Sequence, residues 1–272
     1  MIIWCSDIHL NFLGKERRED FYSCLPGNQE IAASTSGARE GESILITGDI
    51  AESHNIESLL SEMKSCTKKN IYFVAGNHDY YGSSIKKMRS SFKKFKDAYW
   101  LPRGPIKIDN TTMLVGQDGW GDGRNGDYEN SRLVMSDWLY IEELNKAYLK
   151  GSKALLKALQ KVSDLDASNL AKNVLEALQD ATVSRIVIAT HVPPLEEAAL
   201  YAGTKSTPSG LPFFSSQILG VTLLPIIEAN PQVKFIWLSG HTHARCTILK
   251  RGNLKVRVAE ANYYYPQVED LI

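Results

Sequence analysis

The sequence has few cysteines and no excess of charge of either sign. Its 272 residues include four Cys, and 31 Lys and Arg balance 31 Asp and Glu, so the formal net charge is zero. Four widely spaced cysteines without a C-x-x-C pair exclude a small domain built on disulfides, and they indicate reduced thiols. The balanced charge argues against a broad basic surface for nucleic acid, so we expect nucleic acid only as a substrate.

The chain also lacks long apolar runs. No stretch approaches the roughly 20 apolar residues that a membrane-spanning helix requires, and the apolar start MIIWC is too short for a secretory signal. We therefore expect a cytoplasmic protein without a membrane partner. The content of hydrophobic residues, 43%, excludes disorder, and the lack of repeats or a linker predicts a single domain over residues 1–272.

Short apolar runs, most of them followed by Gly, Asp, Asn or His, predict strands that are buried on both faces. They are Ile2–Cys5, Ile44–Thr47, Ile71–Ala75, Met113–Val115, Arg185–Thr190 and Lys234–Leu238. Two further segments, 105–116 and 246–260, have turn residues between apolar stretches and predict β-hairpins.

The spacing of apolar residues between these strands predicts helices. One apolar stripe runs from Ile85 to Tyr99 behind Ser83 or Ser84 as N-cap, and Ser136 is expected to cap a helix that continues through Leu144. The segment 153–178 indicates one long amphipathic helix or a helical pair. The alternation of strands and helices predicts an α/β or layered α+β fold, with a helical insertion at about residues 120–182.

Metal-binding residue types follow five of the predicted strands, in the segments SDIHL, TGDI, GNHD, ATHVPP and SGHTH. Side chains just beyond the carboxyl ends of neighbouring strands converge in α/β sheets, so these segments are expected to meet in one cleft. Seven of their side chains offer imidazole, carboxylate or amide donors: Asp7, His9, Asp49, Asn77, His191, His241 and His243. That mixed set is too large for one metal and predicts two metals that share a carboxylate.

In this order the five motifs resemble the calcineurin-like metallophosphoesterase superfamily, and the resemblance spans Asp7 to His243. It implies a four-layer α/β/β/α sandwich with two mixed β-sheets. It also implies two divalent metal ions, for which Mn, Fe, Zn, Ni and Mg all suit the donors. By resemblance, the ligands of the first metal are Asp7, His9, Asp49 and His243. Those of the second are Asp49, Asn77, His191 and His241.

The same resemblance implies the chemistry. A metal-activated water would attack phosphorus, Asp49 would bridge the metals, and His78 would give a proton to the leaving group. Relatives often carry a second Asp in the pattern GD-x-x-D, and this chain has Glu52 at that position. Either Glu52 or Asp79 is therefore a candidate for orienting His78.

Two motifs of this chain differ from those of one branch of the superfamily, and the difference indicates the class of substrate. Ser/Thr protein phosphatases carry GDYVDRG and GNHE, whereas this chain has GDIAES and GNHD. This difference favours a phosphodiesterase. The alternatives are a phosphomonoesterase, acting on protein or small molecules, and a non-catalytic scaffold of the same fold.

Three residues outside the donor set are candidates for substrate binding. Trp120 and Arg124 lie in a Gly-, Asp- and Asn-rich loop after a predicted strand, where Arg124 could bind a phosphate with its guanidinium fork. Tyr80 follows GNHD directly and could stack on a ring of the substrate. An ordinary surface loop and core packing are the alternative interpretations.

Overall fold

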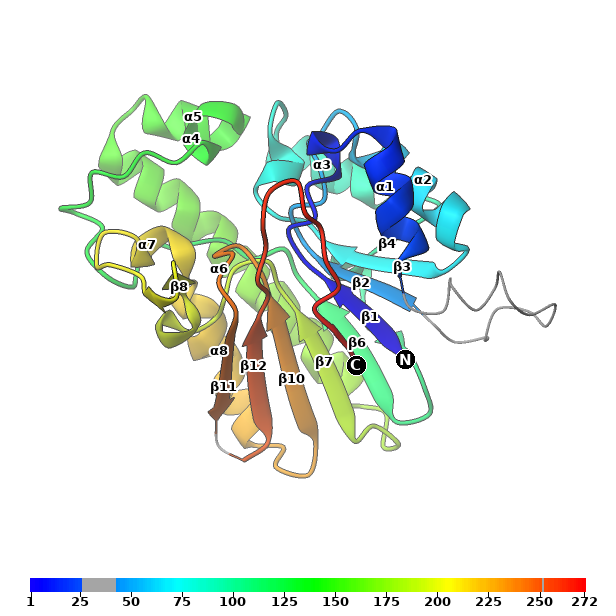
Figure 1. Ribbon diagram of the computed structural model, residues 1–272. Coiled ribbons are helices and arrows are strands. Elements are labelled where there is room, and N and C mark those ends of the chain that lie inside the picture. Colours follow the sequence, from blue (N-terminus) through cyan, green and yellow to red (C-terminus); the bar gives the residue numbers. More distant parts are fainter. Residues whose placement is uncertain (26–42, 251) are drawn as a thin grey trace.

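Two large β-sheets lie face to face with helices on their outer sides (Figure 1). The computed structural model describes residues 1–25, 43–250 and 252–272. The first sheet has the order β13-β1-β2-β3-β4 and the second the order β11-β12-β10-β7-β6-β5. The strands of the first sheet are β1 (Ile2–Cys5), β2 (Ser43–Thr47), β3 (Asn70–Val74), β4 (Tyr99–Trp100) and β13 (Asp270–Leu271). Those of the second are β5 (Ile106–Lys107), β6 (Thr112–Gly116), β7 (Arg185–Ala189), β10 (Lys234–Ser239), β11 (Cys246–Lys250) and β12 (Leu254–Val258).

Both sheets are mixed: the first has an antiparallel strand at one edge and the second at both edges, beside parallel strands. Strand β13 runs antiparallel to β1, and β5 and β11 run antiparallel to β6 and β12. All six predicted strands and both predicted hairpins are present, the hairpins as β5–β6 and β11–β12. A separate two-stranded sheet joins β8 (Leu200–Tyr201) and β9 (Thr204–Lys205).

The helices are attached to the two sheets in separate groups. The first sheet is covered by α1 (Lys15–Ser23), α2 (Ile56–Thr67) and α3 (Ile85–Phe92), and the second by α6 (Ser152–Ala177) and α8 (Gln217–Glu228). The shorter helices are α4 (Asp137–Tyr140), α5 (Glu142–Tyr148) and α7 (Leu211–Phe214), with 3-10 turns at Leu10–Phe12, His78–Tyr80, Leu101–Arg103 and Glu196–Ala198. In the part of the chain that the structure describes, no helix has the length and apolar character needed to cross a membrane.

The alternation of side chains along each strand produces the layers. In β1, Ile3 and Cys5 join the core beneath α1–α3, whereas Ile2 and Trp4 face the other sheet. In β7, Ile188 faces α6 and α8, whereas Val187 packs between the sheets. Each fully buried side chain of this size stabilises the fold by about 1.5–3 kcal/mol. One apolar cluster thus lies beneath α1–α3, one lies beneath α6 and α8, and one lies between the sheets. Together they establish the predicted four-layer α/β/β/α sandwich.

The helix predicted to run as far as Tyr99 is shorter than expected. Helix α3 ends at Phe92, and Tyr99 lies in β4, where it pairs with Tyr72. The apolar spacing that suggested one helix continues because Phe95 and Trp100 are also buried in the same core. The predicted N-cap is confirmed for Ser84, whose side chain accepts a hydrogen bond from the Lys87 amide.

The helix expected after Ser136 is two short helices instead of one. The backbone is extended at Ile141 (φ −106°, ψ 121°), where the chain forms a β-bridge with Ser83, and this interruption separates α4 from α5. The Ser136 side chain makes no capping hydrogen bond. The segment 153–178 forms the single long helix α6 of 26 residues.

A buried ion cluster fixes the segment after β3 to the second sheet and to α6. The Arg89 guanidinium contacts the carboxylates of Asp118 (3.1 Å) and Asp166 (2.7 Å). Asp118 also accepts hydrogen bonds from the Ala75 amide and the Trp100 indole. Removing one member of such a buried cluster leaves an uncompensated charge, which typically costs about 3–5 kcal/mol. The cluster therefore holds the GNHD segment in place.

Candidate metal centre

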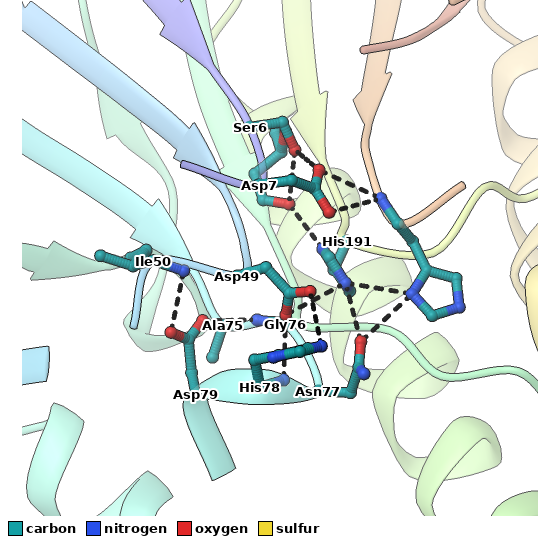
Figure 2. A network of polar contacts seen from close by, with 12 residues as sticks. Ser6, Asp7, Asp49, Ile50, Ala75, Gly76, Asn77, His78, Asp79 and His191 are labelled. Atoms are coloured by element: carbon teal, nitrogen blue, oxygen red, sulfur yellow. Dashed lines mark hydrogen bonds and ion pairs between the residues drawn. The ribbon is translucent and has the colours of Figure 1, made fainter. Parts of the chain in front are cut away.

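The metal ligands predicted from the five motifs meet beyond the carboxyl ends of strands from both sheets, and Figure 2 shows Asp7, Asp49, Asn77 and His191 among them. Asp7 and His9 follow β1, Asp49 follows β2, and Asn77 and His78 follow β3. The second sheet contributes His191 after β7, and His241 and His243 after β10. The site therefore forms only when the two sheets are packed together.

The backbone at these positions is unusual. Eight non-glycine residues of the described chain have positive φ angles, and five of them are predicted metal ligands: Asp7 (50°), His9 (39°), Asp49 (53°), His241 (71°) and His243 (55°). This left-handed conformation costs roughly 1–2 kcal/mol for a residue with a Cβ atom. Strain of this kind persists where the surrounding structure enforces it, and its concentration here marks a functional site.

Glycines allow the loops to approach one another closely. A Cβ atom on Gly76 would lie 2.1 Å from Asp49 Oδ1, and one on Gly240 would lie 2.1 Å from Asp7 Oδ2. Both distances are far below van der Waals contact. Each glycine is therefore required for the carboxylate beside it to occupy its place in the site.

One group of donors consists of Asp7, His9, Asp49 and His243, each with a ligand atom within 4.8 Å of the others. His9 is buried, and neither of its ring nitrogens has a hydrogen-bond partner. Burial lowers the pKa of His9 to about 4, although the charge of Asp49 opposes the shift, so the ring is neutral. A buried, neutral imidazole whose Nε2 lies 3.8 Å from Asp49 Oδ2 fits a divalent cation between the two side chains.

The second group of donors consists of Asp49, Asn77, His191 and His241. The Nε2 atom of His191 lies 3.0 Å from Asn77 Oδ1 and 3.4 Å from Asp49 Oδ1, and His241 Nδ1 lies 3.1 Å from Asn77 Oδ1. The Nδ1 atom of His191 is 2.9 Å from the Thr47 carbonyl oxygen, which can only accept, so Nδ1 carries a proton. In the neutral ring the lone pair of Nε2 therefore faces the oxygens of Asn77 and Asp49, as a metal ligand requires.

The two carboxylates at the centre are ionised. Burial alone would raise the pKa of Asp49, but the charges of His191 and His78 act against burial and lower it. Burial likewise acts against ionisation of Asp7, whose pKa is lowered by a hydrogen bond from His243 and by the charges of His191 and His243. Both residues thus present anionic oxygens to the site.

Asn77 is oriented by a residue that the sequence did not reveal. Its side-chain nitrogen donates to Asp137 Oδ1 (2.9 Å) and lies 3.1 Å from the Tyr81 hydroxyl. The amide oxygen therefore points away from Asp137 and toward His191 and His241. Asp137 stands 60 positions after Asn77 and looks like an ordinary first-turn acid of a helix, so no local signal identifies it.

His78 is held by its backbone and by ring packing. Its backbone amide donates to Asp49 Oδ1 (2.9 Å), and its Nε2 lies 3.8 Å from Asp49 Oδ2. The imidazole ring packs on the Tyr81 ring with centroids 4.4 Å apart and meets the His9 ring edge-on at 4.7 Å. Its orientation is therefore set by aromatic neighbours.

Neither of the two carboxylates considered for orienting His78 is positioned for that role. Asp79 is fully buried and accepts hydrogen bonds from the backbone amides of Ile50, Ala51 and Gly76, so it joins two loops of the site. Glu52 forms its ion pair with His54, at 3.7 Å. The structure gives Asp79 a structural function and turns Glu52 toward the surface.

A pocket of about 450 Å³ opens over the donors. Besides Asp49, Asn77, His241 and His243, it is lined by His78, Tyr81, Val134, Met135, Ser136, Tyr201, Phe214, Thr242 and Tyr263. Tyr81 follows GNHD beside Tyr80, and from the sequence either tyrosine could stack on the substrate or pack in the core. Tyr201 was not selected from the sequence, and the aromatic run at 263–265 fits a strand edge as well as a pocket wall.

The three substrate-binding candidates lie elsewhere. Tyr80 is fully buried and donates its hydroxyl hydrogen to Asp118, and Trp120 packs against it with ring centroids 5.3 Å apart. The Arg124 guanidinium is bound to Asp122 and Asp164. These contacts place Tyr80 and Trp120 in the core and commit Arg124 to ion pairs, so none of the three lines the pocket.

Comparison with known proteins extends these observations. The sequence model of the family described as calcineurin-like phosphoesterase matches residues 1–245. The comparison with curated protein sequences gives no match. Among solved structures, a phosphopantetheinyl hydrolase from Mycobacterium tuberculosis is similar at 14% identity and a TM-score of 0.62, over 96% of this chain and 89% of that chain.

A second similar structure is that of a dimetal phosphatase from Danio rerio. It is 14% identical, with a TM-score of 0.56, over 95% of this chain and 86% of that chain. At this level of identity both likenesses establish the fold. The family match covers most of the chain and confirms the prediction of a metal-dependent enzyme. The chain belongs to the calcineurin-like phosphoesterase family and hydrolyses phosphate esters with the help of metal ions.

Proposed function

We propose that the site holds two divalent metal ions, with Asp49 between them, and hydrolyses phosphodiesters. The observation that carries this proposal is the position of the Asp49 carboxylate. Its Oδ1 faces His191 of one donor group (3.4 Å), and its Oδ2 faces His9 of the other (3.8 Å). When bound, two such ions activate water for attack on phosphorus and neutralise the charge that develops on the phosphoryl oxygens.

The other ligands of this proposal are the residues grouped by the geometry above. Asp7, His9 and His243 complete one set with Asp49, and Asn77, His191 and His241 complete the other. In the first set both nitrogens of the buried His9 ring lack hydrogen-bond partners, and in the second the lone pair of His191 faces an amide oxygen. Both arrangements bring ring nitrogens close to side-chain oxygens, and a divalent cation bound between them would be a ligand partner for both kinds of atom, displacing any ring proton.

His78 is proposed to supply the proton that the leaving oxygen needs. Its ring lines the pocket, and its backbone amide is fixed on Asp49. In the reaction the bond from phosphorus to the ester oxygen breaks and a bond from phosphorus to a water oxygen forms. His78 protonates the departing oxygen, and the attacking water loses its proton to solvent.

The charges around the pocket support a diester over a monoester. No Lys or Arg is present among the described residues that line it, so the lining offers no ammonium or guanidinium group to a phosphate. A diester carries one negative charge, whereas a monoester near neutral pH carries up to two.

The free state of all four cysteines, Cys5, Cys24, Cys66 and Cys246, supports a reducing, cytoplasmic location.

A screen with added metals tests this function. Purified protein is stripped of metal, reloaded separately with Mn, Fe, Zn, Ni or Mg, and assayed with bis(4-nitrophenyl) phosphate, 4-nitrophenyl phosphate, cyclic nucleotides and short DNA. We expect hydrolysis that depends on about two equivalents of metal, with the highest kcat/KM for a diester. A higher kcat/KM for 4-nitrophenyl phosphate would establish the monoesterase alternative. A folded protein with two bound metals and no turnover of any ester would indicate the scaffold.

A further inference from the structure

The walls of the pocket are aromatic and apolar. Tyr201 stacks on Phe214 with ring centroids 6.2 Å apart and planes at 10°, and the Phe214 ring meets His241 edge-on at 5.8 Å. In the other group of proposed metal ligands, the Tyr263 ring packs on the rings of His9 and His243, with centroids 4.7 Å and 5.0 Å apart. Ring faces therefore stand beside both donor groups.

This aromatic wall continues out of the pocket to the surface. Tyr263 contacts Phe12, and Phe12 contacts Tyr264, each at 5.7 Å between ring centroids. The outer parts of the wall are open to solvent: Tyr201 is 64% exposed, Tyr264 54% and Val134 59%. Single exposed apolar side chains are common, but a cluster around the mouth of a pocket indicates a surface for binding apolar groups.

The wall also lacks positive charge. The lining residues that the structure describes offer no ammonium or guanidinium group to a second phosphate. Two arginines close in sequence to aromatic wall residues have other partners: Arg17 lies over the Tyr265 ring, and Arg257 pairs with Asp270. Inside the pocket, a polyanion would therefore place its additional phosphates against uncharged rings, and the lining residues that the structure describes provide no cation to pair with them.

We propose that the substrates are phosphodiesters with a single negative charge whose second ester group is uncharged and aromatic or apolar, and that this group lies against Tyr201 and Tyr263. The proposal rests on the diesterase function above and narrows it. It disfavours polynucleotides and nucleoside polyphosphates. Stacking of a ring on an aromatic side chain tightens binding by about 5- to 150-fold in comparable sites.

The first test varies only the group that stays on phosphorus. Phenyl 4-nitrophenyl phosphate and methyl 4-nitrophenyl phosphate release the same nitrophenolate, so their kcat/KM ratio, corrected for their uncatalysed rates, reports the contact with the retained group. We expect the loaded enzyme to prefer the phenyl ester about tenfold, mainly through KM. Tyr201→Ala should reduce this ratio at least about threefold, whereas Leu139→Ala, at an exposed position on α4 outside the pocket lining, should leave it unchanged.

The second test introduces the missing charge. Val134→Lys places an ammonium at the exposed rim, and Leu139→Lys places one outside the lining as a matched control. A unit charge near a surface site changes binding of a dianion by about two- to tenfold relative to a monoanion at low salt. We expect Val134→Lys to raise kcat/KM for 4-nitrophenyl phosphate and oligothymidylate relative to the diesters, and Leu139→Lys to leave these ratios unchanged.

The outcomes separate this proposal from the function on which it rests. Equal kcat/KM for the phenyl and methyl diesters, or preference for oligothymidylate in the unaltered enzyme, would overturn the substrate class while leaving the diesterase function intact. Failure to hydrolyse any diester with any metal would overturn the proposed function itself. Binding of the non-reactive anion diphenylphosphinate to the metal-loaded protein, weakened by Tyr201→Ala but not by Leu139→Ala, supports the aromatic contact independently of turnover.

Discussion

The hydroxyl of Tyr81 and the buried carboxylate of Asp137 are joined by a hydrogen bond of 2.7 Å. The same carboxylate oxygen holds the side-chain amide of Asn77. A residue from α4 thereby fixes which atom of Asn77 is presented to the donor group. Since Tyr81 also packs on His78, one pair of side chains positions both a proposed ligand and the proposed acid.

Asp137→Ala is expected to weaken one metal site selectively. Without the carboxylate, the Asn77 amide is free to rotate, and loss of such an outer partner typically lowers metal affinity about 10–100-fold. Asp137→Asn, which retains an acceptor oxygen, should restore most of the affinity, and Glu129→Ala at an exposed turn position serves as the control. Competitive titration with a metal-binding dye measures both affinities. Two unchanged affinities in Asp137→Ala would refute this positioning role.

Asp49→Asn is expected to affect both metal sites together. The substitution removes the anionic charge that the two donor groups share, so the metal stoichiometry should fall below two and kcat/KM should fall at least about 10²–10³-fold. Inductively coupled plasma spectrometry and the diester assay measure these two quantities, with Asp164→Asn at an exposed position as the control. Near-normal hydrolysis by Asp49→Asn would contradict the two-metal proposal.

His78→Ala is expected to separate metal binding from proton donation. Metals should stay bound, because the side chain belongs to neither donor group. Esters with alkyl leaving groups need protonation and should slow about 10²–10⁴-fold, whereas nitrophenyl esters, whose leaving group needs no proton, should slow much less. A plot of rate against leaving-group pKa measures the difference, and His78→Phe controls for lost ring packing. Equal losses for both classes of ester would show that His78 is not the acid.

Gly76→Ala is expected to disrupt the centre through contact alone. The added methyl group would lie 2.1 Å from Asp49 Oδ1 and 2.5 Å from its backbone nitrogen, so the Asp49 loop must shift. We expect loss of metal binding and a melting temperature lowered by several degrees, as typical overpacking of about 1–3 kcal/mol implies. Gly14→Ala, which adds a methyl group in open space, is the matched control. If the two variants bind metal equally and have the same melting temperature, the close contact between Gly76 and Asp49 is not required for the metal centre.

Metal affinity is expected to rise with pH through the titration of two histidines. Burial would lower the pKa of His191 and His243, but Asp49 and Asp7 outweigh burial and raise both values above the ordinary one of 6.5. Burial lowers the pKa of His9 and His241 to about 4, so these rings are neutral at any pH between 6 and 8. A metal must displace the proton from a charged ring, so affinity should weaken as pH falls through the raised values.

Calorimetry in buffers of different ionisation enthalpy measures the protons released on metal binding. We expect metal binding near pH 7 to release protons, and this release should decrease in His243→Gln. In His9→Gln, the metal ion that still binds should release protons as before. Proton release lost in His9→Gln and kept in His243→Gln would contradict the assignment.

The metal-donor positions and the layers were predictable because each depends on a local pattern. An apolar run followed by a polar ligand identifies both a buried strand and the end at which its side chain emerges, as for β1 with Asp7 and β2 with Asp49. The alternation of buried residues along such strands, as at Ile3 and Trp4, then creates the sandwich.

The pocket could not be predicted in the same way. Tyr80 and Tyr81 are adjacent in sequence, identical in type and both buried, yet after the 3-10 turn at His78–Tyr80 the hydroxyl of the first bonds to Asp118 and the ring of the second packs on His78. Asp137 acts on a residue 60 positions away, and the break at Ile141 depends on a bridge to Ser83. Contacts between distant segments leave no periodic signal, so Trp120 and Arg124 could be chosen for their chemistry and still lie outside the pocket.

The left-handed backbone at five donor positions has a consequence for engineering this chain. Glycine adopts this conformation freely, so Asp7, His9, Asp49, His241 and His243 are places where a glycine substitution would relieve backbone strain. They are also places where glycine would remove a donor from the centre. A search for more heat-resistant variants that ignores activity is therefore expected to erode the metal centre first, while selection for turnover keeps the fold below the stability that its backbone would otherwise allow.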